Sequence, residues 1–138
     1  MSYAGFWKRV AAAIIDEIII MIGGFAFGFV FVLVMVAGGI DDLAVLEVME
    51  NILGIILIWG YFAVMESSPT QGTLGKMALG IKVTDLEGNK IDFGRATGRH
   101  FAKIISALIL YIGFIMVAFT QEKQGLHDMM AGCLVVTK

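Results

Sequence analysis

The run from Ile18 to Ile40 contains no charged residue, and it limits the chain to very few kinds of fold. As one α-helix the run would be about 34 Å long, which is enough to cross a bilayer core of about 30 Å. A cleaved signal peptide, the competing interpretation, has an apolar core of only about 7–15 residues. The run is longer than that, so we expect a retained membrane helix over about residues 6–38.

The composition supports a membrane environment for the chain. Hydrophobic residues make up 59% and charged residues 16% of its 138 residues, whereas about 25% of a typical soluble domain is charged. Too few polar side chains remain to cover a water-soluble fold, but lipid can solvate apolar helix faces. The single cysteine, Cys133, excludes an intrachain disulfide. We therefore expect one all-α membrane domain over residues 1–138.

Two further patterns predict a second spanning helix and a small β-structure. An apolar segment over about residues 46–66 ends before Pro69, and proline stops a helix. Downstream, Leu79, Ile81 and Val83 alternate with small or polar residues, which is the period of a β-strand. A turn signal at residues 87–89 follows, so we expect a β-hairpin over about 79–93.

The distribution of charge predicts the orientation in the membrane. The segment 38–51 contains acidic residues and no basic ones, whereas the segment 66–99 carries Lys76, Lys82, Lys90, Arg95 and Arg99. The N-terminus adds Lys8 and Arg9. By the positive-inside rule we expect a multi-pass protein whose N-terminus and β-hairpin are cytoplasmic.

A third hydrophobic helical element, over about residues 93–120, can be arranged in two ways. Asp92 can cap a helix that starts at Phe93. A C-terminal strand over about 133–137 would pair naturally with the strand near Ile81, which places the C-terminus in the cytoplasm. The third element would then be interfacial or re-entrant and bent near Gly113. We favour this arrangement, and a simple third span is the alternative.

Ionisable residues are expected to gather at the inner membrane boundary. Arg9 and Asp16 are two helical turns apart and share one face of the first helix. Glu66 ends the second helix at the same boundary, and His127 with Asp128 reaches it if the C-terminus is cytoplasmic. Two interpretations stay open: Arg9 pairs with the aspartates and locks the elements together, or buried carboxylates exchange a proton for a cation.

A basic stripe lies on the helix expected after residue 93. Arg95, Arg99 and Lys103 fall on one face of that helix, where they can bind anionic lipid headgroups or simply anchor the chain at the membrane.

Several other patterns exclude further chemistry. The segment Gly72–Lys76 lacks the spacing of a phosphate-binding loop. His100, His127 and Cys133 lack zinc-ligand spacing, so we expect no metal. With no Ser/His/Asp or Cys/His arrangement in the sequence, we expect neither an enzyme nor a cofactor, and no nucleic-acid partner.

Three ordered blocks of sequence resemble the RDD family of small bacterial membrane proteins. The opening block is Tyr3–Arg9 with Asp16, the central block is Gly72–Lys76 followed by residues 79–83, and the closing block is Gln124–Asp128. The resemblance implies that Arg9 is the family arginine and that Asp16 and Asp128 are its two aspartates. It also implies a bacterial inner membrane location and a transport role, with cation–proton exchange suggested for some members. Leu74 departs from the pattern, because the family often has proline there.

We therefore expect membrane transport, with protons or monovalent cations carried by Asp16 and Asp128 and with Arg9 as their partner. Glu66 and His127 are further coupling candidates. Because two spans are few for a pathway, we expect a homo-oligomer. The alternative is a non-catalytic membrane module that binds anionic lipid or a partner membrane protein through Arg95, Arg99 and Lys103.

Overall fold

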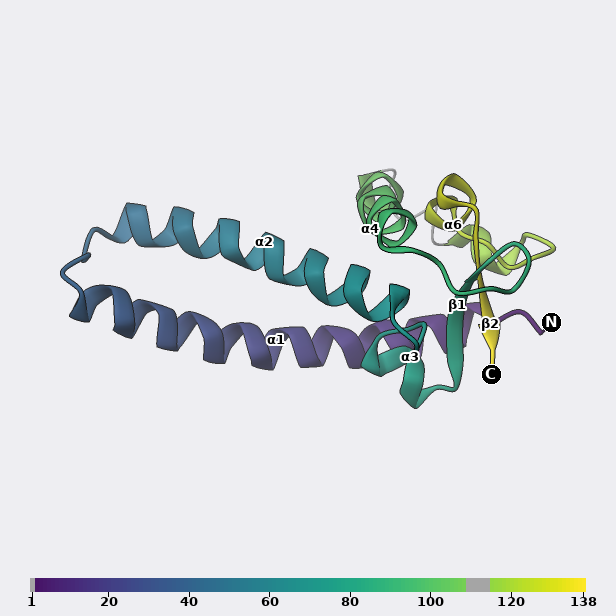
Figure 1. Ribbon diagram of the computed structural model, residues 1–138, viewed down its shortest axis with the longest axis horizontal. Coiled ribbons are helices and arrows are strands. Elements are labelled where there is room, and N and C mark those ends of the chain that lie inside the picture. Colours follow the sequence, from purple (N-terminus) through teal and green to yellow (C-terminus); the bar gives the residue numbers. More distant parts are fainter. Residues whose placement is uncertain (1, 109–114) are drawn as a thin grey trace.

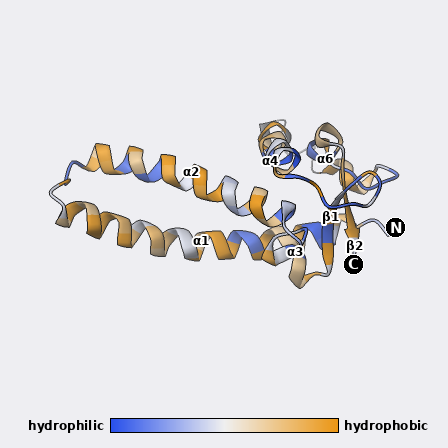
Figure 2. Cartoon of the chain, viewed as in Figure 1, coloured by the Kyte–Doolittle hydropathy of each residue, from blue (hydrophilic) through white to orange (hydrophobic). Residues whose placement is uncertain are grey.

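The computed structural model describes residues 2–108 and 115–138, and a long helical hairpin dominates it (Figure 1). Helix α1 comprises Phe6–Ala37 and helix α2 comprises Leu43–Ser67. Both helices are long and apolar enough to cross a membrane. Their outer faces are orange over most of the length in Figure 2, and large side chains such as Phe25 are up to 80% exposed. An apolar surface of this extent is suited to lipid rather than to water.

The loop between the two helices determines where α2 begins. Helix α1 ends at Ala37 and is followed by the capping residue Gly38, and Gly39 has a φ of +93°, which favours glycine. Asp42 then caps α2, because its carboxylate accepts hydrogen bonds from the N–H groups of Ala44 and Val45. Helix α2 therefore begins at Leu43, three residues before the predicted start at about 46, and Glu47 and Glu50 lie inside it.

A two-stranded antiparallel sheet stands beside the first turns of α1. Strand β1, Ile81–Asp85, pairs with strand β2, Cys133–Thr137, so that Ile81 lies opposite Thr137. Tyr3 forms a bridge with Val136, and the Ala4 N–H donates to the Val135 carbonyl at 2.8 Å. The two ends of the chain therefore meet on this sheet, as the labels N and C show in Figure 1.

The predicted β-hairpin over 79–93 is wrong, because residues 90–93 form no strand. The predicted pairing of a C-terminal strand with the strand near Ile81 is confirmed. The Asp85 carboxylate accepts hydrogen bonds from the N–H groups of Glu87 and Asn89 and closes a tight turn. The chain then leaves the sheet, and Asp92 accepts a hydrogen bond from the Arg95 N–H at 2.7 Å at the start of the next helix. This capping is the one expected from the sequence.

Helix α4, Phe93–Leu108, crosses the end of the hairpin and is seen along its axis in Figure 1. Ala96 and Ala102 are buried on one face, whereas Phe101 and Ile104 are about half exposed on the other. Because β2 pairs with β1, the chain enters and leaves this region on one side, and a simple third span does not fit the sheet. The predicted re-entrant bend near Gly113 lies outside the described residues.

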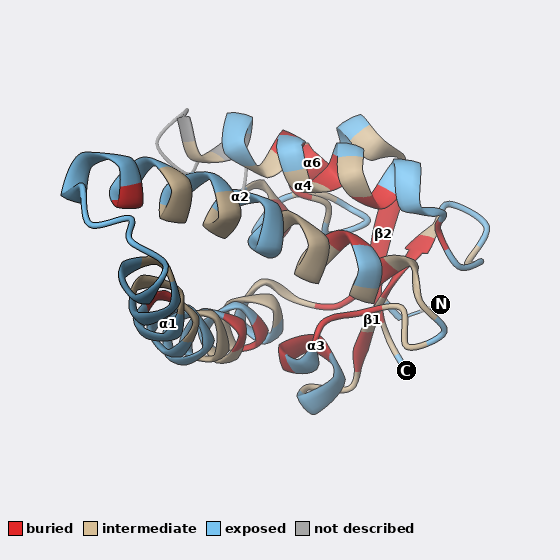
Figure 3. Ribbon diagram, turned by 60° about the vertical axis from the view of Figure 1, so that its left-hand side comes forward, coloured by how far each residue is buried: buried red, intermediate tan, exposed pale blue. Residues whose placement is uncertain are grey.

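Among the residues described, three short helices complete the end of the molecule opposite the loop between α1 and α2. They are α3 (Leu74–Ala78), the 3-10 helix η1 (Met116–Ala118) and α6 (Leu126–Ala131). Figure 3 shows that buried residues gather at this end and are sparse along the hairpin. Its hydrophobic core includes Ile81, Val83, Ile91 and Val135.

Candidate functional site: a buried charged cluster

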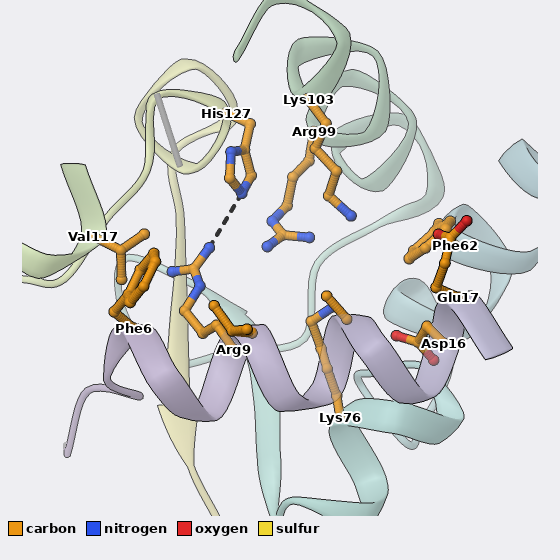
Figure 4. A pocket seen from close by; sticks show the side chains of 12 residues that line it. Phe6, Arg9, Asp16, Glu17, Phe62, Lys76, Arg99, Lys103, Val117 and His127 are labelled. Carbon is orange, nitrogen blue, oxygen red and sulfur yellow. Dashed lines mark hydrogen bonds between the residues drawn. The ribbon is translucent and has the colours of Figure 1, made fainter. Parts of the chain in front are cut away.

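Ionisable side chains from five helices converge where α1 meets this end of the molecule. Figure 4 shows those that line a cavity of about 210 Å³, whose walls also include Phe6, Val10 and Phe62. We call the following residues the charged cluster: Arg9 from α1, Glu66 from α2, Lys76 from α3, Arg99 and Lys103 from α4, and His127 and Asp128 from α6.

Asp128 is fully buried between two arginines. Arg9 Nη2 is 2.5 Å from Asp128 Oδ2, and Arg99 Nε is 2.8 Å from Asp128 Oδ1. The Gly125 N–H at the start of α6 also donates to Oδ2, at 3.0 Å. Burial alone would raise the pKa of Asp128, but the charges of Arg99 and Arg9 outweigh burial and hold this pKa well below its ordinary value. Asp128 is therefore a fixed anion at neutral pH.

Glu66 is the second fully buried anion of the charged cluster, and it has three basic neighbours. Arg99 Nη1 donates to both Glu66 oxygens, at 2.7 and 2.8 Å. Lys76 Nζ lies 3.1 Å and Lys103 Nζ lies 3.9 Å from Glu66 Oε1. Arg99 thus bridges Glu66 and Asp128, and only 1% of its side chain is exposed. These contacts join α2, α3, α4 and α6.

Asp16 lines the same cavity, but its hydrogen bonds come from uncharged donors. Oδ1 accepts from the Tyr61 hydroxyl at 2.8 Å and from the Gly75 N–H at 2.9 Å, and Oδ2 accepts from the Thr73 hydroxyl at 2.5 Å. A Cβ atom on Gly75 would meet the Ala12 carbonyl oxygen and lie 2.8 Å from the Asp16 carboxyl carbon. Glycine is required here because α3 approaches α1 so closely.

His127 is held as a neutral hydrogen-bond acceptor. Its Nε2 lies 3.1 Å from Arg9 Nη2, and a guanidinium can only donate. The ring proton must therefore be on Nδ1. Burial lowers the pKa of His127 to about 2, and this lowering outweighs the opposing attraction of Asp128. His127 thus adds no charge to the cluster at neutral pH.

Lys103 and Lys76 are the lysines at the cavity. Lys103 Nζ lies 4.1 Å from the centre of the Phe62 ring. Burial lowers the pKa of Lys103 to about 7, and the positive charges of Arg99 and Lys76 lower it further, although Glu66 opposes them. Burial also lowers the pKa of Lys76. Lys103 therefore titrates near neutral pH in the folded protein.

The structure brings together most of the site residues expected from the sequence. Arg9, Glu66, His127 and Asp128 meet in the charged cluster, and Asp16 lies beside them but bonds to the start of α3. The expected lipid-binding stripe is divided: Arg99 and Lys103 face inward to Glu66, and Arg95 is exposed and lines a separate hollow between α4 and α6.

Sequence reasoning missed Lys76, Thr73 and Tyr61. One signal could have found Lys76: Glu66 ends an apolar helix, so a buried carboxylate there needs basic partners from nearby segments. Within residues 2–108 and 115–138, no group of His, Cys, Asp and Glu has the geometry to hold a metal ion.

A helical hairpin suited to a bilayer, closed at one end by arginine–carboxylate pairs, defines a small integral membrane protein. The sequence matches the RDD family over residues 3–132, and the chain belongs to that family. It is 39% identical to the "Uncharacterized protein YxaI" of Bacillus subtilis (strain 168), over 98% of this chain and 97% of that protein. It is 32% identical to the "Uncharacterized membrane protein YteJ" of the same strain, over 98% of this chain and 81% of that protein. No solved structure gives a significant match.

Proposed function

We propose that this membrane protein binds an anionic phosphate-bearing lipid headgroup in the cavity of the charged cluster. The observation that carries the proposal is the convergence of four basic side chains on one cavity. Four basic side chains, Arg9, Lys76, Arg99 and Lys103, surround two buried carboxylates, Glu66 and Asp128. An anion that enters the cavity would meet these basic side chains, while the carboxylates of Asp16 and Glu17 also line its walls.

The shape of the cavity supports a headgroup as the ligand. The side chains of Arg9, Lys76 and Lys103 are 11%, 10% and 19% exposed, so each can reach an incoming group, whereas Arg99 is enclosed. The apolar wall of Phe6, Val10, Ala13, Phe62 and Val117 offers contact to the part of a lipid nearest its headgroup. The exposed carboxylate of Glu17 at the cavity would oppose an anion, so it sets a limit on where the phosphate can lie.

The position of the cavity along the hairpin also suits a headgroup. The cavity lies at the base of the apolar spans, where a bilayer boundary would fall. The basic residues Lys8, Lys82 and Lys90 belong to the same end of the molecule, which supports a cytoplasmic orientation of this end and of the N-terminus.

Binding should be measured with purified protein and vesicles of defined composition. Phosphatidylglycerol vesicles should bind more tightly than phosphatidylcholine vesicles, and Lys103→Gln and Lys76→Gln should remove most of the difference. Lys90→Gln is the matched control, because Lys90 is an exposed basic residue outside the cavity. Equal binding to both lipids by a folded wild-type protein would refute the proposal.

Cation–proton exchange is the second candidate function, although the cluster carboxylates are poorly placed for it. Asp128 is neutralised by two arginines, and Asp16 already accepts three hydrogen bonds. A different carboxylate, Glu50 within the hairpin, supports this candidate, because it lies between the apolar helices α1 and α2 and away from the arginines. Proton flux in proteoliposomes after addition of Na⁺, K⁺ or Li⁺ should be lost in Glu50→Gln and kept in Glu47→Gln. Absence of flux in folded wild type would contradict it.

A further inference from the structure

A groove between α1 and α2 contains the polar side chains of Glu50 and Asn51, and Tyr61 lines it as well. Its other lining residues are small or apolar. The groove has a volume of about 480 Å³, and its walls include Gly23, Gly24 and Gly54. It lies in the part of the hairpin that is apolar on its outer surface (Figure 2) and is separate from the charged cluster.

The Glu50 carboxylate lies against the backbone of α1. A Cβ atom built on Gly28 would collide with Glu50 Oε1, and Gly28 is buried although its helix is largely exposed. The side chain of Glu50 therefore extends across the interhelical space onto Gly28. It does not extend along α2 toward the loop at residues 38–42.

Helix lengths place this contact inside the hydrocarbon. From Asp16 to Ala37, α1 is about 32 Å long, which matches the thickness of a bilayer core of about 30 Å. Gly28 lies about 14 Å from the Ala37 end of α1, and Glu50 lies about 10 Å from the Leu43 end of α2. The contact is thus well below the membrane surface on the side of the 38–42 loop.

Glu50 has no charged partner in the part of the chain that the structure describes. Among the described residues, its carboxylate has neither an ion-pair partner nor a hydrogen-bond donor. Helix α1 presents no ionisable residue between Glu17 and its end at Ala37. On α2 the nearest ionisable residue is Glu47, which is exposed one turn closer to the loop. An ionised carboxylate without a partner is costly at this depth, and a bound proton would remove its charge.

We propose that the Glu50 carboxyl is a proton-binding site inside the membrane that exchanges with water on the side of the 38–42 loop. The bound proton resides on a carboxyl oxygen against Gly28, and the amide of Asn51 is the adjacent polar group in the groove. This proposal deepens the second candidate function, for which it supplies the exchanging group, and it is independent of headgroup binding at the charged cluster.

Carbodiimide labelling in proteoliposomes tests the site without measuring flux. A carbodiimide adds to a protonated carboxyl: the oxygen bonds to the central carbon, the proton moves to a nitrogen, and no group leaves. We expect the apolar reagent dicyclohexylcarbodiimide to label Glu50, faster as the pH is lowered, with loss of that label in Glu50→Gln. A water-soluble quaternary-ammonium carbodiimide should label Glu47 and not Glu50, as read by peptide mass spectrometry.

Two glycine variants provide a matched comparison. Gly28→Ala should displace the carboxyl from α1, so that the water-soluble reagent labels Glu50. Gly24→Ala, one turn away with no atom within 4 Å of its Cβ position, should label as wild type. The proposal would be overturned if the water-soluble reagent labelled Glu50 of the wild type as fast as Glu47. It would also be overturned if neither reagent labelled Glu50 in folded protein. Labelling as expected without cation-driven flux would keep the proton site and reject only cation exchange.

Discussion

Arg99 donates from one nitrogen, Nη1, to both carboxylate oxygens of Glu66, and it leaves its Nε for Asp128. Burial would lower the pKa of Arg99, but the two carboxylates outweigh burial and raise it above its ordinary value. One guanidinium therefore links the end of a spanning helix to α6 near the C-terminus. Removing one member of such a buried network leaves the other charges without compensation.

We therefore expect Arg99→Met to destabilise the protein by roughly 3–5 kcal/mol. Arg95→Met, one turn earlier on the same helix, should change stability little, because Arg95 is exposed. Thermal unfolding in detergent, followed by tryptophan fluorescence, measures both variants. Similar melting temperatures for Arg99→Met and Arg95→Met would show that the buried network is not needed for stability.

The two aspartates should respond differently to conversion to asparagine. Asp128→Asn leaves Arg9 and Arg99 without their shared anion. Asp16→Asn keeps one oxygen acceptor and perturbs only hydrogen bonds from uncharged donors, which leaves no buried charge without its partner. The melting temperature should accordingly fall further in Asp128→Asn. The reverse order would mean that Asp16 has charged partners in solution.

Gly75 should tolerate no side chain. Gly75→Ala places a methyl group against the Ala12 carbonyl and the Asp16 carboxyl, and overpacking of this kind costs roughly 1–3 kcal/mol. Gly98→Ala is the control, because its Cβ position in α4 is open, and it should raise stability by up to about 1 kcal/mol. Chemical denaturation compares the two. A Gly75→Ala variant as stable as wild type would contradict the close approach of α3 to α1.

Stability should rise between about pH 7 and 10.5, with a contribution from Lys103. The pKa of Lys103 is about 7 in the folded protein against 10.5 for an unperturbed lysine. Across this window the unfolded chain binds more protons than the folded one, so raising the pH favours folding. Lys103→Met should flatten the dependence of melting temperature on pH, and Lys90→Met should not. Some slope should remain, because the pKa of Lys76 is shifted in the same direction.

Local patterns predicted the elements of the fold well. The uncharged run of the first helix, the capping by Asp92 and the alternation around Ile81 each depend on neighbouring residues, and each feature is present in the structure. The hairpin over 79–93 was wrong because strand pairing depends on distant segments. The turn signal correctly predicted a turn, but no strand follows it at 90–93. The pairing of β1 with β2, some 50 residues later, is the one predicted for the C-terminal strand.

The sequence predicted which residues belong to the charged cluster better than it predicted which of them pair. Hydropathy places Arg9, Glu66 and Asp128 at one membrane boundary, so their approach follows from depth. Helical spacing put Arg99 and Lys103 on one face but could not say that this face points inward to Glu66. Asp16 does not pair with Arg9, because the lack of a side chain on Gly75 allows the start of α3 to lie against α1 and bond to Asp16.

The pairing of Arg9 with Asp128 joins residues 119 positions apart in the chain. During synthesis the first helix leaves the ribosome long before α6 and β2 are made. Arg9 therefore has no contact with Asp128 while α2 is inserted. The sheet can therefore be completed only after β2 has been synthesised. A chain that stops short of Asp128 would leave Arg9 without its anion and β1 without its partner strand.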